Sequence, residues 1–593
     1  MNILHLLSQN HLTGAEVYAV TLAHQQIEQQ HQVYQLSNGF YFPSRAIKLK
    51  LEIETRSKIT FIKNVLWLRN FIRKQNIHVV HTHSRASAKL AYWALLFSNT
   101  AQVSTVHGVQ HSSFSKKLHN QYGEFIIAIC ENVKNHLVKD FSYSERRMKI
   151  IPNPLDATEF HYLQNNKPAS GAKRIAIIGR TTGPKKQRTE QVLNELKSLP
   201  FDITLVGGAL TDLDITPDLR SKIKEVHSVG LNSEFYSGFD LIVGSGRVCI
   251  EALMTGVPVI AFGEAKYIGL ITENNFHAAL KSNFGDIHPD SKEPRIDSEK
   301  FRTDVQSAAG NPEVLAKLAF NEFSLKKISQ NILRIYESAY FLKNYSSWIP
   351  TLMYHKIPDA QIQSQHKIFV TKKMFEKHLQ FFKKRGFQTL TFSELQKFRT
   401  GRKSFKEFPK KPLILTFDDG YRDNLENASP LLKKYGFRAQ LFLLSDSDIN
   451  KNAWDANASE PAHEIVSGAE RLKWKDSAFE IGSHGFSHQK ITEFDSQSAL
   501  IELSESKKAL EREFDRPVNV FAFTYGITAQ DSAELAQTAG YDYAVNTDSG
   551  GLLMEEDPYS IYRVNIFPDE NRLSLFKKTS KWYRKYYYFK RNK

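Results

Sequence analysis

Residues 240–264 have the sequence DLIVGSGRVCIEALMTGVPVIAFGE. An apolar run leads into a Gly-Ser-Gly turn, a segment with helical spacing follows, and Gly256 and Pro258 precede a second apolar run. Short Val- and Ile-rich strands that alternate with helices are typical of a parallel sheet covered on both faces. This stretch therefore predicts an α/β fold of the doubly wound kind.

The same alternation of strand and helix extends over the first 345 residues. It starts with MNILHLL and a Thr-Gly turn before AEVYAVTLAHQQIEQQ, and it returns in NIHVVHTHS, QVSTVHG, FIIAICENVKNHL, RIAIIGR and FDITLVGG. The stretch from Pro152 to Lys173 loses this periodicity and becomes rich in Pro, Asn and Ser, as linkers are. We therefore expect two doubly wound domains, residues 1–165 and 166–345.

Composition and charge limit the class of protein. The 593 residues are too many for one core, and 41% apolar residues exclude collagen-like and wholly disordered chains. The 79 Lys and Arg exceed the 63 Asp and Glu by 16, which favours an anionic partner. With only Cys130 and Cys249, neither a disulfide framework nor a thiolate metal site is expected. We find no signal-peptide pattern and no run of about 20 apolar residues, so we expect a cytoplasmic protein.

The last third of the chain carries two motifs at the ends of apolar strands. In PLILTFDDGY, residues 412–421, the strand runs into Asp418 and Asp419, and Gly420 permits a turn that lets both carboxylates converge. In FEIGSHGFSH, residues 479–488, His484 and His488 are four residues apart. This spacing predicts two imidazoles on one helical face, and a carboxylate with two imidazoles leaves metal positions open for water and substrate.

Together these motifs resemble the polysaccharide deacetylase (NodB-homology) family over about residues 348–570. The resemblance implies a (β/α) deformed-barrel domain over residues 346–576 that hydrolyses N-acetyl groups. It also implies that Asp419, His484 and His488 hold a divalent metal, expected to be Zn, and that Asp418 is the general base. This chemistry needs an activated water, a polarised carbonyl and a stabilised tetrahedral intermediate.

The chain departs from this family in two places. The third motif is FAFTYG, with Thr524 where Pro is usual, and its supporting Arg is replaced by a loose candidate, Arg516, or by Arg563, for which a surface or core ion pair is the alternative. The family's late His general acid is missing, because no His follows His488. His355 in LMYHKI is the candidate acid, with a hydrogen-bonded structural role as the alternative.

The segments TGAEVYAVTLA, VVHTHS, STVHG, IAICENVKNHL and IPNPLDATEF, followed by IIGR, resemble the retaining GT-B glycosyltransferases that use nucleotide-sugars, over about residues 1–340. The expected fold class is thus α/β, with GT-B double Rossmann-like domains followed by the deformed-barrel domain. The resemblance places Gly14, at a helix N-terminus, beside the donor diphosphate. Glu16 fits this site or a first-turn charge favoured by the helix dipole. His107 fits a contact near the donor sugar or a structural role.

In the second half of this region, GRTTGPKK resembles the family's Gly-Arg-x5-Lys element, which places Arg180 and Lys185 on the diphosphate of the leaving nucleotide. Glu251 corresponds to the acid that meets the nucleotide ribose. The family's first acid is replaced by Val243, so that Ser245 or Arg247 takes its place, or the donor differs, or catalysis is lost. A GT-B nucleotide-sugar epimerase is a further alternative.

Basic and aromatic residues are concentrated at the C-terminus. Residues 577–593, KKTSKWYRKYYYFKRNK, contain eight Lys or Arg, six aromatic residues and no acid. Such a tail suits an anionic membrane surface, where rings lie at headgroup depth and cations meet lipid phosphates. A disordered tail and nucleic-acid binding are alternatives, and the absence of a recognised nucleic-acid module argues against the second. A second basic run, residues 45–74, could add another membrane contact.

The sequence therefore predicts a bifunctional cytoplasmic enzyme, peripheral at the inner face of the membrane. It would transfer an N-acetylhexosamine from a nucleotide-sugar to a lipid-linked or lipopolysaccharide-type acceptor and remove the acetyl group. The alternative is a deacetylase whose degenerate GT-B half serves as a scaffold that binds nucleotide or acceptor.

Overall fold

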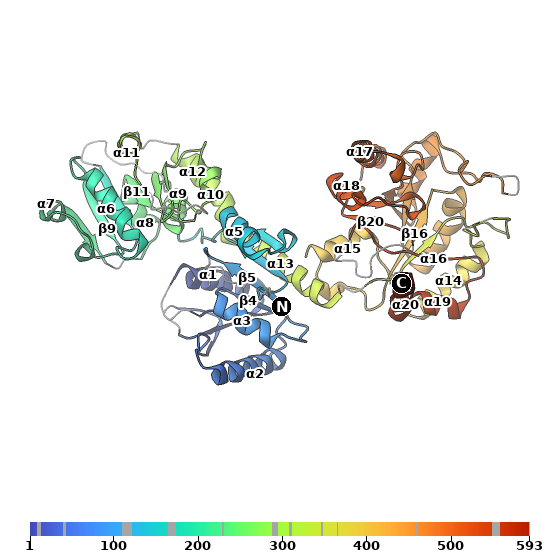
Figure 1. The fold of residues 1–593 in the computed structure, drawn as a ribbon, viewed down its shortest axis with the longest axis horizontal. Helices are drawn as coiled ribbons and strands as arrows, with labels where there is room; N and C mark the ends of the chain where they lie inside the picture. The colour runs from blue at the N-terminus through green and yellow to red at the C-terminus, as the bar shows by residue number, and fades with distance from the viewer. Residues whose placement is uncertain are drawn as a thin grey trace. The chain divides into compact units, whose positions relative to one another are not determined.

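The computed structural model describes the chain except residues 9–12, 40–42, 110–120, 164–172, 228–229, 288–294, 308–310, 346–347, 365, 457–459, 548–557 and 592–593. The chain divides into two units, Met1–Lys343 and Asn344–Lys593, near the boundary expected at residues 345/346. The boundary expected at residues 165/166 lies outside the described residues. Both units are built from parallel sheets with helices on their faces (Figure 1). Within the described part, no helix combines the length and the apolar character needed to cross a bilayer.

The first unit begins with a seven-stranded parallel sheet in the order β3-β2-β1-β4-β5-β6-β7. Its central strands are buried on both faces, which explains their continuous apolar runs. The elements of this half are β1 (Asn2–Leu6), α1 (Gly14–Glu28), β2 (Gln32–Ser37), β3 (Ile47–Lys50), α2 (Lys58–Lys74), β4 (Val79–Thr82), α3 (Arg85–Ala94), β5 (Ala101–Val106), β6 (Phe125–Ala128), α5 (Glu131–Phe141) and β7 (Met148–Ile150).

The second half of this unit has a six-stranded sheet in the order β10-β9-β8-β11-β12-β13, parallel except for β13. Gly256 ends α9 with φ of 86°, a conformation that favours glycine. The elements are β8 (Arg174–Ile178), α6 (Pro184–Leu196), β9 (Asp202–Val206), α7 (Pro217–Ser221), β10 (Ile223–Val226), α8 (Ser233–Ser237), β11 (Leu241–Gly244), α9 (Arg247–Thr255), β12 (Val259–Phe262), β13 (Tyr267–Leu270), α10 (Phe276–Leu280), α11 (Ser298–Gln306) and α12 (Pro312–Phe323).

A long helix, α13 (Leu325–Tyr345), returns from the second sheet to the first. Its residues Ile328 and Ile332 share an apolar cluster with Ile3 and Tyr18 of the first sheet and α1. The two sheets thereby belong to one unit, and the predicted double doubly wound architecture is confirmed.

The second unit is a barrel of parallel strands in the order β20-β19-β18-β17-β16-β14-β21, with β15 beside β16. The sheet closes where Ile561 pairs with Val545 of β20, just before β21. This confirms the predicted deformed barrel. Its elements are β14 (Thr351–Tyr354), α14 (Lys372–Lys384), β15 (Gln388–Thr389), α15 (Phe392–Arg399), β16 (Pro412–Asp418), α16 (Ser429–Tyr435), β17 (Ala439–Leu443), β18 (Phe479–Ser483), α17 (Ser496–Phe514), β19 (Val520–Ala522), α18 (Ser532–Thr538), β20 (Tyr543–Val545), β21 (Val564–Asn565), α19 (Arg572–Lys578) and α20 (Lys581–Arg591).

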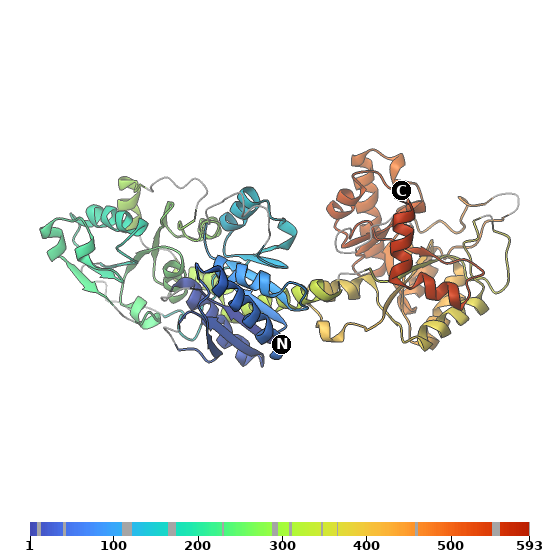
Figure 2. The ribbon, with the colours of Figure 1, turned by 60° about the horizontal axis from the view of Figure 1, so that its bottom comes forward.

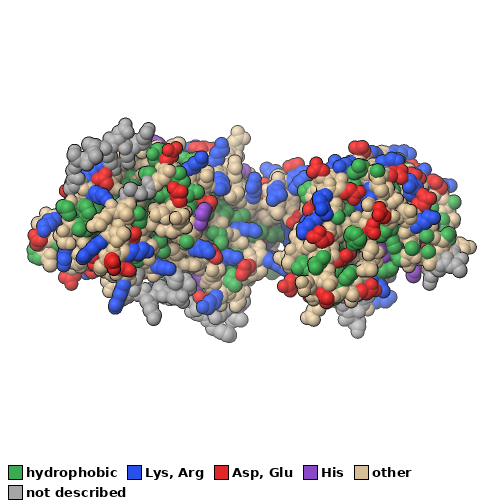
Figure 3. Space-filling model, turned by 90° about the horizontal axis from the view of Figure 1, so that it is seen from above, with side chains coloured by type: hydrophobic (Ala, Val, Ile, Leu, Met, Phe, Trp, Pro, Cys, Tyr) green, Lys and Arg blue, Asp and Glu red, His purple; other side chains and the backbone are tan. Residues whose placement is uncertain are grey.

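The basic C-terminal segment is helical. Lys577, where the sequence predicts the start of a tail, lies inside α19, and α20 follows it along the outside of the second unit (Figure 2). Arg584 is buried, with its guanidinium 3.6 Å from the ring centre of Tyr562. This contact fixes α20 to the barrel. On the face shown in Figure 3, acidic and basic side chains of this unit are interspersed.

Candidate active sites

The ends of the barrel strands bring the motifs of the second unit together. Asp418 ends β16, and its two carboxylate oxygens accept bonds from the two terminal nitrogens of Arg563, at 2.5 and 2.8 Å. Arg563 is completely buried at the seam where the barrel closes, and its Nε also donates to the carbonyl of Asn546 at 2.8 Å. A bidentate pair of this kind fixes a carboxylate in one orientation.

Asp419 faces the two histidines. Its Oδ1 lies 3.4 Å from Nε2 of His484 and 3.5 Å from Nε2 of His488. All three side chains are buried. His484 follows β18 directly, and its Nδ1 lies 2.8 Å from the carbonyl oxygen of Ala522, which favours the tautomer that turns an unprotonated Nε2 toward Asp419.

The prediction that His484 and His488 share a helical face is wrong. Both residues follow β18 in a loop, and His488 has φ of 66°. The strand ends at Gly482 and Ser483, and Gly485 at φ of 87° turns the chain back toward Asp419. The two imidazoles converge through this loop instead, with ring centres 5.1 Å apart.

The three side chains fit a divalent cation. Their ligand atoms all lie within 4.8 Å of one another, and Oδ1 of Asp419 is buried without a hydrogen-bond partner. A buried carboxylate oxygen without a donor is costly unless a cation is bound there. Burial alone would raise the pKa of Asp419, but the adjacent imidazoles of His484 and His488 hold it well below its usual value, so the carboxylate is ready as a ligand.

Asp418 and Asp419 are consecutive at the end of β16, but the first pairs with Arg563 and the second faces the two histidines. Asp419 has φ of 73° and Gly420 has φ of 80°, so the chain turns sharply after Asp418. A Cβ on Gly420 would lie 2.4 Å from Leu443, which explains the glycine. His484 lies close enough to both carboxylates to lower the pKa of each.

His355 lies at the same site. Its Nε2 is 3.8 Å from Oδ2 of Asp418, and the side chain is largely buried. Burial lowers the pKa of His355, while Asp418 and Asp419 raise it in part. Burial alone would raise the pKa of Asp418, but Arg563, His484 and His355 hold it below its ordinary value. Of the two sequence candidates for the supporting Arg, Arg516 is exposed before β19 and Arg563 holds Asp418.

Two aromatic side chains at this site were not found from the sequence. Trp454 stacks on His488, with ring centres 4.1 Å apart and planes 12° from parallel. Tyr525 approaches the same imidazole edge-on at 4.8 Å and is 45% exposed. Tyr525 follows Thr524 in the FAFTYG motif and has φ of 56°. Two partly exposed aromatic side chains beside the histidines suit the apolar face of a sugar ring.

In the first unit, Arg180 and Lys185 lie at the carboxyl end of the second sheet. Arg180 is 3.6 Å and Lys185 3.8 Å from Glu264, and Lys185 is 3.5 Å from Asp286. Lys185 is mostly buried, whereas Arg180 is exposed. Both cations thus face Glu264, and an anionic ligand would have to replace the carboxylates.

Buried Arg188 was missed by the sequence analysis. Its Nη1 donates to Ser245 Oγ at 3.2 Å and to the Phe262 carbonyl at 3.0 Å, and Lys185 donates to the same hydroxyl at 3.2 Å. Arg188 lies within α6, where no local sequence motif marks it as a functional residue. The hydroxyl of Ser245 thus orients Lys185 and Arg188.

Val243, at the position of the family's first acid, offers no contact to a donor sugar. It lies in β11, completely buried in the apolar cluster that contains Ile177 and Leu205. Glu251 is buried in α9, where its two oxygens accept from Tyr236 at 2.7 Å and from Arg247 at 2.6 Å. Arg247 is thus occupied by Glu251.

Gly14 is the exposed first residue of α1, and a Cβ there would meet nothing within 4 Å. Glu16 accepts bonds from the backbone and hydroxyl of Thr13 in a capping box, which explains this acid without a ligand. His107 follows β5, and its ring lies edge-on to Tyr18 at 5.0 Å. Its buried Nε2 has no hydrogen-bond partner, and burial lowers its pKa to about 4.

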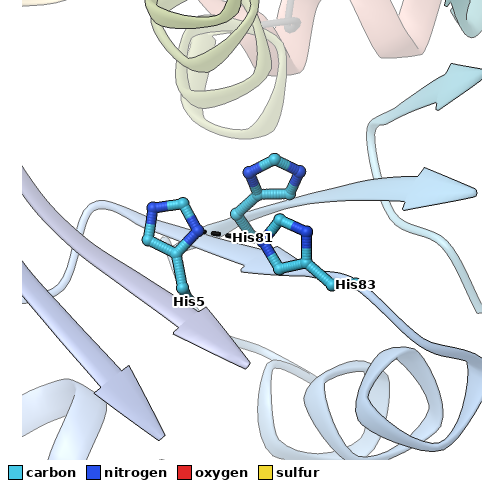
Figure 4. Close-up of side chains that lie close together, drawn as sticks. All are labelled: His5, His81 and His83. Atoms are coloured by element: carbon cyan, nitrogen blue, oxygen red, sulfur yellow. Dashed lines mark hydrogen bonds between the residues drawn. The ribbon is translucent and has the colours of Figure 1, made fainter. Parts of the chain in front are cut away.

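Three more histidines lie beside His107, and Figure 4 shows them grouped at the ends of β1 and β4. His5 Nδ1 is 2.9 Å from His83 Nε2, and the other nitrogen of His5 is 2.9 Å from Gln26. Both nitrogens of His81 are also within bonding distance of hydroxyl groups. The three rings are close enough for a cation, but hydrogen bonds already use both nitrogens of His5 and of His81 and leave only Nδ1 of His83 without a partner among the described residues. Burial lowers the pKa of all three histidines, so they form a buried neutral network.

Two family models match the chain. Residues 12–159 match the model described as Glycosyltransferase Family 4, and residues 405–544 match the one described as Polysaccharide deacetylase. The chain is thus similar to glycosyltransferases in its first part and to polysaccharide deacetylases in its last part, as in a fusion of the two.

Individual proteins match each region. YxkH of Bacillus subtilis (strain 168), named for the polysaccharide deacetylases, is 29% identical over 232 residues, which are 39% of this chain and 76% of that protein. The poly-beta-1,6-N-acetyl-D-glucosamine N-deacetylase of Staphylococcus aureus (strain MRSA252) is 22% identical over 259 residues, or 42% of this chain and 79% of that protein. A solved glycosyltransferase from Rickettsia africae ESF-5 covers 58% of this chain and 99% of its own, at 20% identity and a TM-score of 0.46.

Proposed function

We propose that the chain is a bifunctional enzyme of glycan or glycolipid biosynthesis. Its first unit transfers an N-acetylhexosamine from a nucleotide-sugar to a lipid-linked or lipopolysaccharide-type acceptor, and its second unit removes the acetyl group. The observation that carries the proposal is the pairing of Asp418 with Arg563 beside the Asp419, His484 and His488 cluster. The acetylated sugar named for the Staphylococcus aureus relative supports the substrate class.

The deacetylase residues divide the work. Asp419, His484 and His488 would hold a divalent metal, with Zn suited to one carboxylate and two imidazoles. When bound, such a metal polarises the amide carbonyl and makes water more acidic. Asp418, held by Arg563, accepts the proton of the attacking water. His355, whose Nε2 lies 3.8 Å from Oδ2 of Asp418, would give a proton to the leaving amine.

In the first unit, Arg180 and Lys185 would bind the diphosphate of the donor, where charge develops as the sugar leaves. Ser245 and the buried Arg188 keep Lys185 in place. Glu251 would meet the ribose in place of its present partner Tyr236 or Arg247. Gly14 and His107 would line the opposite side of the donor site. This assignment needs the ligand to displace Glu264 and Asp286 from the cations.

One chain with both activities delivers the acetylated product to the second site at high effective concentration. The basic aromatic helix α20 would hold the enzyme on an anionic membrane surface, at the inner face, where a lipid-linked acceptor lies. We assign no nucleic-acid partner.

The alternative is a deacetylase with a degenerate first unit that binds nucleotide or acceptor without transfer. Val243 favours it, because this residue fills the core and leaves the donor sugar without one acidic contact. A direct assay separates the two proposals. The purified chain is given nucleotide-sugars and a lipid-linked acceptor, and both transferred sugar and released acetate are measured. Release of acetate without any transfer supports the scaffold, whereas neither product contradicts both proposals.

A further inference from the structure

Helix α2 has two apolar faces. Leu68 and Ile72 point into the first unit and are buried in the cluster that contains Leu4 and Leu36 of the sheet. On the other side, Ile59, Ile62 and Leu66 are 69%, 58% and 57% exposed. A helix that covers a sheet normally has polar residues on its outer face. The outer row therefore does not serve the fold of this unit.

Large aromatic side chains extend this row onto α3. Trp67 is 41% exposed and stacks on Phe71 with ring centres 5.5 Å apart. Arg69 donates to the carbonyl oxygens of Trp93 and Ala94, which holds the end of α3 beside α2. Trp93 is 44% exposed. Exposed Trp beside aliphatic residues is typical of surfaces that meet the lipid headgroup region.

The charges on this surface have one sign. The two helices carry Lys or Arg at the following positions and neither contains Asp or Glu: Lys58, Lys63, Arg69, Arg73, Lys74, Arg85 and Lys89. The acids closest along the chain, Glu52 and Glu54, precede α2, and Glu54 accepts a bond from Ser8. The surface thus combines an exposed aliphatic row with cations and no acid in its helices.

We propose that the outer surface of α2 and α3 binds the interface of an anionic bilayer, with α2 lying in the plane of the membrane. The aliphatic row enters the headgroup region and the cations meet lipid phosphates. Nucleic acid fits less well, because the most exposed side chains of this surface, Ile59, Ile62 and Leu66, are aliphatic and do not stack on bases as the less exposed Trp67 and Trp93 could. A second copy would bring two sets of cations together. The proposal does not depend on the proposed activities, since binding needs no turnover.

The test is co-sedimentation of the full chain with vesicles of phosphatidylcholine alone or with one quarter phosphatidylglycerol. We expect binding to the anionic vesicles only. The variant Ile62→Ser/Leu66→Ser should lower the partition coefficient at least ten-fold, and each of Lys63→Gln and Arg73→Gln by about five-fold. Ile501→Ser, an exposed Ile of α17 in the other unit, is the matched control and should bind as wild type.

A second measurement covers failure of the double variant to fold. Leu66→Cys is labelled with a polarity-sensitive dye, which is selective because Cys130 and Cys249 are buried. The dye should shift to the blue on anionic vesicles, and the same dye at Ile501→Cys should not. Three results would overturn the proposal: unchanged binding by the double variant, loss of binding only after Trp582→Ser in α20, or self-association of the wild type that the double variant abolishes.

Discussion

Replacement of Arg563 by Met tests whether this residue holds the catalytic carboxylate. The guanidinium is completely buried, and it donates two bonds to Asp418, which is itself only 2% exposed. Removing one partner of such a pair leaves an uncompensated buried charge, which costs about 3 to 5 kcal/mol of unfolding free energy. Loss of a correctly held general base lowers kcat by at least about 100-fold. Both effects are expected in Arg563→Met.

The assays are urea unfolding of the full chain and release of acetate from an N-acetylglucosamine oligomer, with bound metal measured in each preparation. The double variant Asp418→Asn/Arg563→Met removes both charges of the buried pair and should recover most of the lost stability. It should remain inactive. Recovered stability without recovered acetate release would separate the contribution of Arg563 to folding from its contribution to catalysis.

Arg471→Met is the matched control. Arg471 is a second buried Arg of the same unit, paired with Glu513 at 2.8 Å. Its loss should destabilise the unit, while acetate release per folded molecule stays within about three-fold of wild type. If Arg563→Met loses less than about 1 kcal/mol, or keeps its activity as the control does, the inferred role of Arg563 is incorrect.

Three further predictions concern metal binding, nucleotide binding and the pH dependence of stability. Asp419→Asn should lower the metal bound per chain, measured by elemental mass spectrometry, at least ten-fold, while the exposed His366→Gln leaves it unchanged; equal metal in both would contradict the ligand set. Lys185→Gln should weaken binding of uridine diphosphate, measured by calorimetry, about ten-fold, because a charge-assisted bond is lost, and the neighbouring Lys186→Gln should not. Since burial lowers the pKa of His107 from 6.5 to about 4, the unfolded chain binds its proton first as the pH falls, and His107 alone should contribute a loss of about 3 kcal/mol to the stability of the first unit between pH 6.5 and 4, beside that of the other buried histidines. Urea unfolding at several pH values checks this loss, which should be smaller in His107→Gln.

The sequence predicted the sheets because their strands are continuous apolar runs. The parallel arrangement and the positions of Asp418, His484 and Arg180 at strand ends follow from the same pattern. The loop geometry around His488 did not follow, because a spacing of four residues suits both a helix and a loop. The loop is decided by Gly485, whose positive φ is visible only in the structure.

Residues that act at a distance in the sequence were harder to find. Arg563 lies 145 residues after Asp418 in the sequence. The two residues meet only because the barrel closes at Ile561. Trp454 lies in the segment between β17 and β18 and reaches His488 by tertiary packing alone. In the first unit, the mid-helix Arg188 is buried against carbonyl groups of two strands. Arg563 was a candidate only through the resemblance to the polysaccharide deacetylases. No local pattern predicts the contacts of Trp454 and Arg188, because each depends on where the chain returns.

The central claim is that one chain both transfers an acetylated hexosamine and deacetylates it. Mass spectrometry of glycolipids and surface polysaccharide tests it most directly in three strains: wild type, a deletion, and Asp418→Asn with normal protein levels. We predict that the deletion lacks a hexosamine, and that Asp418→Asn keeps it with one additional acetyl group. If both strains retain the sugar and differ from wild type only by the acetyl group, the first unit does not transfer it, and the claim is contradicted.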